Sequence, residues 1–186
     1  MEIKQYKDME RSVKFDDEIR RKYRYSLWCR WNESLPQVTF VMLNPSKADE
    51  NDHDPTLYKC IKFAHNWHYG SLEVVNLFAY VATKPTELPK PHIDDDDPVG
   101  LANNSYIQSA TKRADLIIVA WGADPYLTKN HNHNRVTEVL SLISGQKTLH
   151  CLKLTKIKYP LGLTKKEYPR HPLYIKDSTQ PMMFPI

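Results

Sequence analysis

The sequence predicts an α/β fold of three layers, in which helices cover both faces of a central, mainly parallel sheet of four strands. Short apolar runs, typical of strands buried on both faces, alternate along the chain with segments whose apolar residues recur at helical spacing. Two of these segments open with Asp-Pro, a pair in which the aspartate caps a helix and the proline occupies its first turn. Alternating strands and helices favour a parallel sheet.

The first half of the chain contributes two of the four central strands. Residues 23–31 alternate between two kinds of side chain, which predicts an additional, half-exposed strand at the N-terminal edge of the sheet, with Arg24 on its polar face. Residues 38–43 form a continuous apolar run and predict a buried strand. Asp54 and Pro55 then open a helix, and residues 72–78 predict the second buried strand.

The second half of the chain contributes the other two central strands. Residues 79–97 contain three prolines and a run of aspartates, so we expect a loop. The pair Asp97-Pro98 predicts a helix that continues to about Arg113. Residues 115–121 predict the third strand, a helical pattern begins at Asn134, and residues 148–154 predict the fourth strand.

Composition is typical of one folded domain. The chain has 186 residues, of which 41% are hydrophobic and 26% charged. Residues 1–22 form a charged lead-in, and residues 23–186 are expected to form the domain. The N-terminus does not resemble a signal peptide, and no apolar run approaches the roughly 20 residues of a membrane span. The three cysteines include no Cys-x-x-Cys pair. We therefore expect a cytoplasmic monomer without a metal or cofactor.

Polar and aromatic residues stand at or near the ends of the predicted strands. Because ligands of parallel α/β sheets bind at the carboxyl ends of the strands, these residues predict a site; they are Asn44, Asn76, Trp121 and His171. Each has a structural alternative, since asparagine satisfies turns, tryptophan is common in cores and histidine can be held by neighbouring prolines. Asn76 is the hardest to explain structurally, because a buried unpaired amide costs about 1–3 kcal/mol.

The residue types at this site suit recognition of a flat heterocycle. An asparagine amide offers a donor and an acceptor and can read a base edge. Aromatic residues can stack on a base, and a histidine can donate to an oxygen on which negative charge develops. No carboxylate pair, Ser-His-Asp order or glycine-rich phosphate loop stands out, and the chain has only five glycines.

A basic segment lies near the C-terminus. From Lys147 to Lys176 the chain has eight lysines and arginines and one acid, Glu167. Such a segment can contact nucleic-acid phosphates, and it can equally be a solvated surface. Within it residues 152–160 are repeated as 161–169, which predicts a lengthened loop or hairpin. The residues expected to contact DNA are Lys156, Lys158, Lys165, Lys166 and Arg170.

Five short motifs give the sequence a family resemblance. They are MLNPS (42–46), DPT (54–56), VVNLFA (74–79), IIVAWG (117–122) and PRHPLY (169–174). In this order they resemble the uracil-DNA glycosylase superfamily, and more closely an uncharacterised bacterial and phage branch of it. The resemblance runs from about residue 23 to the C-terminus and implies the three-layer fold of those enzymes.

The resemblance implies roles for individual residues. Asn44 would hold the hydrolytic water, and His171 would stabilise the departing base, so these two are the expected catalytic residues. The residues expected to bind the base are Asn76, Phe78, Trp121, Pro45 and Ser46. Leu173 replaces the usual serine after His-Pro, and with Tyr174 it is expected to meet the DNA. No aspartate matches the water-activating one of the fastest members; Asp49, Asp52 and Asp54 are open alternatives.

The function implied is that of a monofunctional DNA glycosylase. It would hydrolyse the N-glycosidic bond of a flipped-out, modified pyrimidine, in anti-phage defence or DNA repair. Two alternatives remain open, which are a hydrolase of free nucleosides or nucleotides and a non-catalytic DNA- or nucleotide-binding module. Histidines 65, 68, 131 and 133 are interpreted as surface residues, because a third metal ligand at a recognisable spacing is missing.

Overall fold

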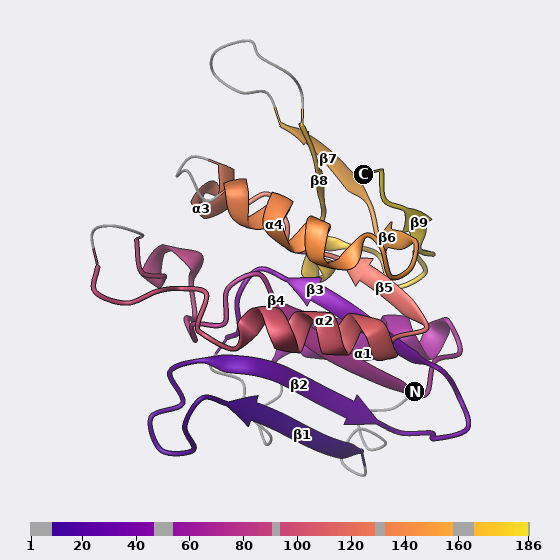
Figure 1. Cartoon of the computed structure of the whole chain (residues 1–186). Coiled ribbons are helices and arrows are strands. Elements are labelled where there is room, and N and C mark those ends of the chain that lie inside the picture. The colour runs from indigo at the N-terminus through magenta and orange to yellow at the C-terminus, as the bar shows by residue number, and fades with distance from the viewer. Residues whose placement is uncertain (1–8, 47–53, 91–93, 129–132, 158–165, 186) are drawn as a thin grey trace.

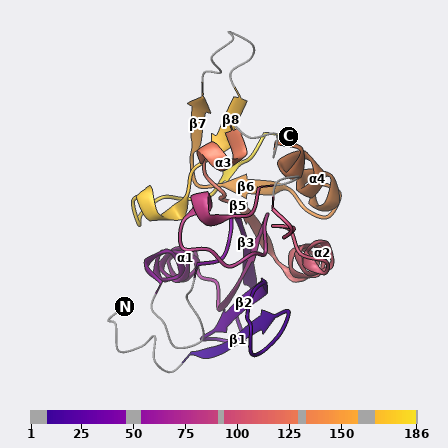
Figure 2. The same ribbon diagram turned by 90° about the vertical axis from the view of Figure 1, so that its left-hand side faces the viewer.

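A seven-stranded sheet with helices on both faces organises the protein (Figure 1). The computed structural model describes residues 9–46, 54–90, 94–128, 133–157 and 166–185. In spatial order the strands are β1 (Glu10–Phe15), β2 (Arg24–Arg30), β4 (Ser71–Asn76), β3 (Gln37–Met42), β5 (Leu116–Val119), β6 (Leu149–Cys151) and β9 (Met182–Met183). A separate hairpin of β7 (Leu154–Ile157) and β8 (Lys166–Pro169) stands away from this sheet (Figure 2).

The predicted α/β class is confirmed, but the predicted sheet of four mainly parallel strands with one edge strand is wrong. The sheet is mixed: β4, β3, β5 and β6 run parallel, whereas β1, β2 and β9 pair antiparallel at the edges. With the β7–β8 hairpin, four of the seven pairings between the described strands are antiparallel. The added strands β1 and β9 contain few buried residues, so they lack the apolar runs that identify central strands.

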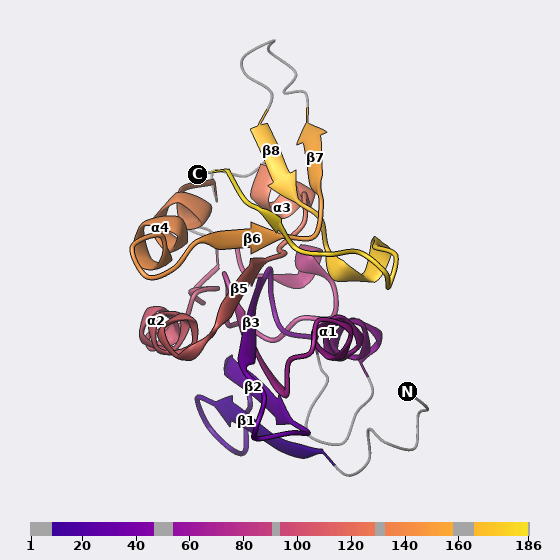
Figure 3. The same ribbon diagram turned by 90° about the vertical axis from the view of Figure 1, so that its right-hand side faces the viewer.

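The helices cover the two faces unequally. Helix α1 (Pro55–Asn66) packs on one face, and α2 (Asn103–Arg113) and α4 (His133–Ile143) pack on the other (Figure 3). The short helix α3 (Pro125–Thr128) and the 3₁₀ turns η2 (Pro85–Glu87) and η3 (Pro172–Tyr174) lie in loops. No helix in the described segments is long and apolar enough to cross a membrane.

The two Asp-Pro pairs behave differently. Asp54 caps α1 as predicted, because its side chain accepts hydrogen bonds from the Thr56 and Leu57 N–H groups. The predicted start at Asp97-Pro98 is wrong, since α2 begins at Asn103. Gly100 between them has a φ of +79°, a left-handed conformation that interrupts a helix.

The continuous apolar run of β3 is explained by burial on both faces. Phe40 and Met42 belong to the core beneath α1, whereas Val41 and Leu43 belong to the core beneath α2 and α4. Residue 39 is a threonine, whose hydroxyl donates to the Ala110 carbonyl of α2. Successive side chains of β3 therefore enter opposite cores, and this fixes which side chains face each helical layer. The carboxyl end of the strand lies between the two layers.

Gly70 occupies a turn that has no room for a side chain. Its N–H donates to the Pro36 carbonyl, and its own carbonyl accepts from Trp31 and Asn32. A Cβ atom at this position would lie 1.9 Å from the Asn32 carbonyl oxygen.

We expect Gly70→Ala to lower the free energy of unfolding by about 2–3 kcal/mol, because backbone must move to accommodate the methyl group. Chemical denaturation measures the loss. Gly145→Ala is the matched control, since a Cβ there meets nothing within 4 Å. Equal stability of the two variants would contradict the tight turn.

Candidate functional site

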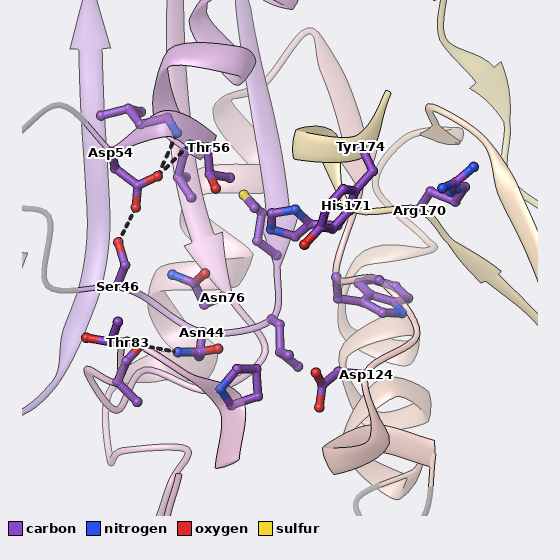
Figure 4. A pocket seen from close by; sticks show the side chains of 18 of the residues that line it. Asn44, Ser46, Asp54, Thr56, Asn76, Thr83, Asp124, Arg170, His171 and Tyr174 are labelled. Atoms are coloured by element: carbon purple, nitrogen blue, oxygen red, sulfur yellow. Dashed lines mark hydrogen bonds between the residues drawn. The ribbon is translucent and has the colours of Figure 1, made fainter. Parts of the chain in front are cut away.

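A cavity of about 520 Å³ opens at the carboxyl ends of the parallel strands (Figure 4). Asn44 follows β3, Asn76 ends β4 and Trp121 follows β5, and all three line the cavity. His171, from the segment after β8, lines the same cavity. Four residues widely separated in the chain thus meet in one space, as the strand-end pattern predicted.

Hydrogen bonds from two helices hold the backbone at Asn76, whereas the amide nitrogen of its side chain has no partner among the described residues. Asn103 of α2 donates from Nδ2 to the Asn76 and Leu77 carbonyls, each at 3.1 Å. Arg135 of α4 donates from Nε to the Leu77 carbonyl at 2.7 Å. Asn76 is 1% exposed, and its Nδ2 has no hydrogen-bond partner among the described residues. An acceptor on a ligand would satisfy this donor.

The Asn44 amide has a defined orientation. Its Nδ2 donates to the Ala82 carbonyl at 2.8 Å and to the Pro45 carbonyl at 3.1 Å. Both amide hydrogens are therefore occupied, and Oδ1 remains as the acceptor that the side chain can offer. This arrangement suits a water molecule or a ligand N–H group.

The imidazole of His171 is neutral at neutral pH. Burial lowers its pKa, although the Asp54 charge opposes the shift. Its Nδ1 accepts a hydrogen bond from the Leu173 N–H at 3.4 Å. The neutral ring therefore carries its proton on Nε2, which makes that atom a hydrogen-bond donor.

Gly122 connects the third parallel strand to the His171 segment. Its N–H donates to the Pro169 carbonyl at 3.0 Å. It has a φ of +79°, and a Cβ atom there would lie 3.4 Å from the His171 Cβ. The left-handed backbone favours glycine, which explains the Trp-Gly pair at this strand end.

Asp54 brings a negative charge to the cavity wall. Burial alone would raise the pKa of its carboxyl, but hydrogen bonds from the Ser46 hydroxyl and the Thr56 and Leu57 N–H groups outweigh burial and lower the pKa. Of the three aspartates considered for water activation, Asp49 and Asp52 lie outside the described residues. Asp54 is a weak base because its pKa is lowered, but its charge can stabilise a nearby cation.

The sequence interpretation missed two charged residues of the wall. Arg24, expected on a half-exposed face, is 5% exposed and lines the cavity; no sequence pattern marks it. Asp124 also lines the cavity and accepts from the Tyr126 N–H at 2.8 Å at the start of α3. It precedes Pro125, so the Asp-Pro pattern used for other helices was a signal that could have found it.

Several predicted site residues lie elsewhere or at the margin. Phe78 is in the core, with its ring edge-on to Tyr126, and neither it nor Pro45 is in the cavity wall. Trp121 is 1% exposed and packs against Phe184. Ser46, Arg170 and Tyr174 do line the cavity.

The expected DNA contacts are only partly described. Leu173 is exposed and outside the cavity wall, and Tyr174 is 71% exposed at its edge. Lys156 and Lys166 are strand residues of the β7–β8 hairpin, where their backbones lie opposite Glu167 and Ile157. Lys158 and Lys165 lie outside the described residues, as does His131. In the described part of the chain, no three His, Cys, Asp or Glu side chains gather as metal ligands.

Comparison with known proteins identifies the family. A family model described as "Protein of unknown function (DUF1643)" matches residues 24–173. The chain belongs to the DUF1643 family. The matched region of this DUF1643 protein begins at Arg24 and includes all the cavity-lining residues except Tyr174. No curated protein and no solved structure matches the chain significantly.

We expect nitrogen NMR of the imidazole to show His171 protonated on Nε2 and unprotonated on Nδ1 at pH 7, with a pKa below the ordinary 6.5 because the ring is buried. A titration midpoint for His171 above 6.5 would contradict the neutral ring.

We expect Asn103→Ala to lower the free energy of unfolding by about 1–3 kcal/mol, because two buried carbonyls lose a donor. Urea denaturation measures the change. Asn66→Ala is the control, since this exposed side chain makes one hydrogen bond, to the Asp177 carbonyl. Equal losses of stability in the two variants would contradict the role of Asn103 in holding the end of β4 in place.

Proposed function

We propose that this DUF1643 protein is a DNA glycosylase of the uracil-DNA glycosylase superfamily, which hydrolyses the N-glycosidic bond of a flipped-out, modified pyrimidine in DNA. The observation that carries the proposal is the meeting of Asn44, Asn76 and His171 in one cavity. Its volume of about 520 Å³ is within the range of small-molecule sites and leaves space for a substituent on the base.

The available hydrogen-bonding groups suit a pyrimidine. Asn76 offers an unsatisfied donor for the edge of the base. The Nε2–H group of His171 would donate to a ring carbonyl oxygen, which becomes more negative as the glycosidic bond breaks. A neutral imidazole can take this role because its Nε2–H group is a hydrogen-bond donor.

The remaining groups suit hydrolysis. The Oδ1 atom of Asn44 would accept from a water molecule and direct it to C1′ of the sugar. The amide is too weak a base to take the proton early, so positioning and electrostatics would dominate. The ionised carboxylate of Asp54 would favour the cationic sugar that forms when the bond breaks.

Binding to DNA would extend beyond the cavity. Arg170 lines the cavity, and Tyr174 is exposed beside it. The basic β7–β8 hairpin immediately precedes this segment of the chain and stands away from the sheet (Figure 2). We expect affinity for duplex DNA that falls with salt concentration, which a hydrolase of free nucleosides would not show. A monomer acting in anti-phage defence or repair is consistent with this proposal.

The test is excision from duplexes that carry uracil, a hydroxymethylated pyrimidine or a glucosylated pyrimidine. Abasic sites are detected by alkaline strand cleavage. We expect product from at least one duplex, and about a 10²–10³-fold lower rate for Asn44→Ala and His171→Ala. Exposed Asn66 and His65 give the matched controls Asn66→Ala and His65→Ala, which should retain the wild-type rate. No product from any duplex, or full activity of His171→Ala, would refute the proposal.

A further inference from the structure

The segment that carries His171 is held at both of its ends. At its start, the Gly122 N–H donates to the Pro169 carbonyl at 3.0 Å, and the Arg170 N–H donates to the Lys153 carbonyl at 2.7 Å. The 3₁₀ turn η3 follows, and this turn contacts α1 (Figure 3). The position of the imidazole therefore depends on the hairpin side and on the contact with α1.

Lys59 of α1 holds the far end of the turn. Its Nζ donates to the carbonyl of Ile175, the residue that ends η3, at 2.7 Å. The same ammonium forms an ion pair with Asp177 and lies 5.6 Å from the centre of the Phe63 ring. The Lys59 side chain is 21% exposed, so its charge-assisted hydrogen bond to Ile175 is mostly shielded from water.

The turn connects this lysine to the imidazole. The His171 carbonyl accepts from the Tyr174 N–H at 3.3 Å. The Pro172 carbonyl accepts from the Ile175 N–H at 3.0 Å. The His171 Nδ1 accepts from the Leu173 N–H. Because these hydrogen bonds close the turn, a displacement at Ile175 displaces the ring as well.

Helix α1 also carries part of the cavity wall. Asp54 caps the helix and lines the cavity, as do Thr56 and Leu57 in its first turn. Lys59 follows in the next turn of the same helix. A single helix thus carries wall residues at its start and holds the His171 turn further along, so it fixes the position of the imidazole relative to that wall.

We propose that Lys59 is a positioning residue for His171, which holds the imidazole in the cavity through the Ile175 carbonyl and η3. The inference rests on the proposed function, in which the Nε2–H group must meet one ring oxygen of the departing base. Such a contact depends steeply on geometry, and a misplacement of about 1 Å can cost about 10²-fold in rate. Lys59 is not itself among the described residues of the cavity wall.

Lys62 provides a matched control. It pairs with the second carboxylate oxygen of Asp177, and its side chain is 41% exposed. In the described part of the chain it makes no hydrogen bond to the backbone of the His171 segment. Lys59→Met and Lys62→Met each remove one ammonium and one ion pair with Asp177, but only Lys59→Met releases the Ile175 carbonyl.

The first test is an NMR titration of the His171 imidazole, which needs no substrate. In the wild-type protein, burial holds the pKa of the ring below 6.5. We expect Lys59→Met to raise the titration midpoint toward 6.5, because the released turn exposes the ring to water, and Lys62→Met to leave the midpoint unchanged. Lys59→Gln is a second neutral variant that should show the same rise, and it decides should Lys59→Met not fold. An unchanged midpoint in the Lys59 variants, or an equal rise in Lys62→Met, would overturn the inference.

The second test is kinetic. Lys59→Met should lower kcat for base excision about 10- to 10²-fold with little change in KM, whereas Lys62→Met should retain the wild-type rate. In a His171→Ala background, Lys59→Met should cause no further loss, because the side chain through which it acts is gone. A purely structural lysine would lower the rate equally in both backgrounds, and that result would refute the positioning role.

The outcomes separate this inference from the proposed function. A raised His171 midpoint in Lys59→Met, together with no excision of any base by the wild-type protein, would leave the positioning contact and remove the glycosylase. Excision by the wild-type protein, together with an unchanged midpoint and an unchanged rate in Lys59→Met, would leave the glycosylase and remove the role of Lys59.

Discussion

The end of strand β4 is the constraint on which the rest of the site depends. The Asn76 and Leu77 carbonyls accept hydrogen bonds from side chains of two helices: Asn103 of α2 and Arg135 of α4. These buried donors fix the backbone at Asn76 without using its side-chain amide. These hydrogen bonds hold the end of β4 in position and leave the Asn76 Nδ2 group without a partner among the described residues, which is the arrangement expected of a preorganised binding site.

A second connection brings the C-terminal segment to the same cavity. The left-handed Gly122 donates to the Pro169 carbonyl, and His171 lies beside the glycine. Strand β5 and the hairpin are thereby joined at the point where the imidazole enters the wall. The burial that results keeps the ring neutral, so its chemistry follows from packing and not from a neighbouring base.

The electrostatics of the cavity combine neutral donors with separated charges. Asp54 stays ionised because its oxygens cap α1 and accept from Ser46, and Arg24 stays protonated although it is buried. Hydrolysis of an N-glycosidic bond creates a cationic sugar and an anionic base. A wall that already holds both signs of charge needs little reorganisation as that separation develops.

The sequence by itself determined the α/β class, the central strands, the Asp54 cap and the polar residues at the strand ends. Each of these depends on a local signal: the spacing of apolar residues, an Asp-Pro pair, or an amide within an apolar run. The sequence could not determine the mixed sheet, since β1 and β9 are edge strands with few buried residues, and β9 pairs with β6, which is far from it in the chain. Nor could it place Arg24, which stands on the polar face of an alternating strand but is 5% exposed and donates to the Ser46 carbonyl. Burial of that charge is a property of packing between segments far apart in the chain, and only the tertiary structure decided it.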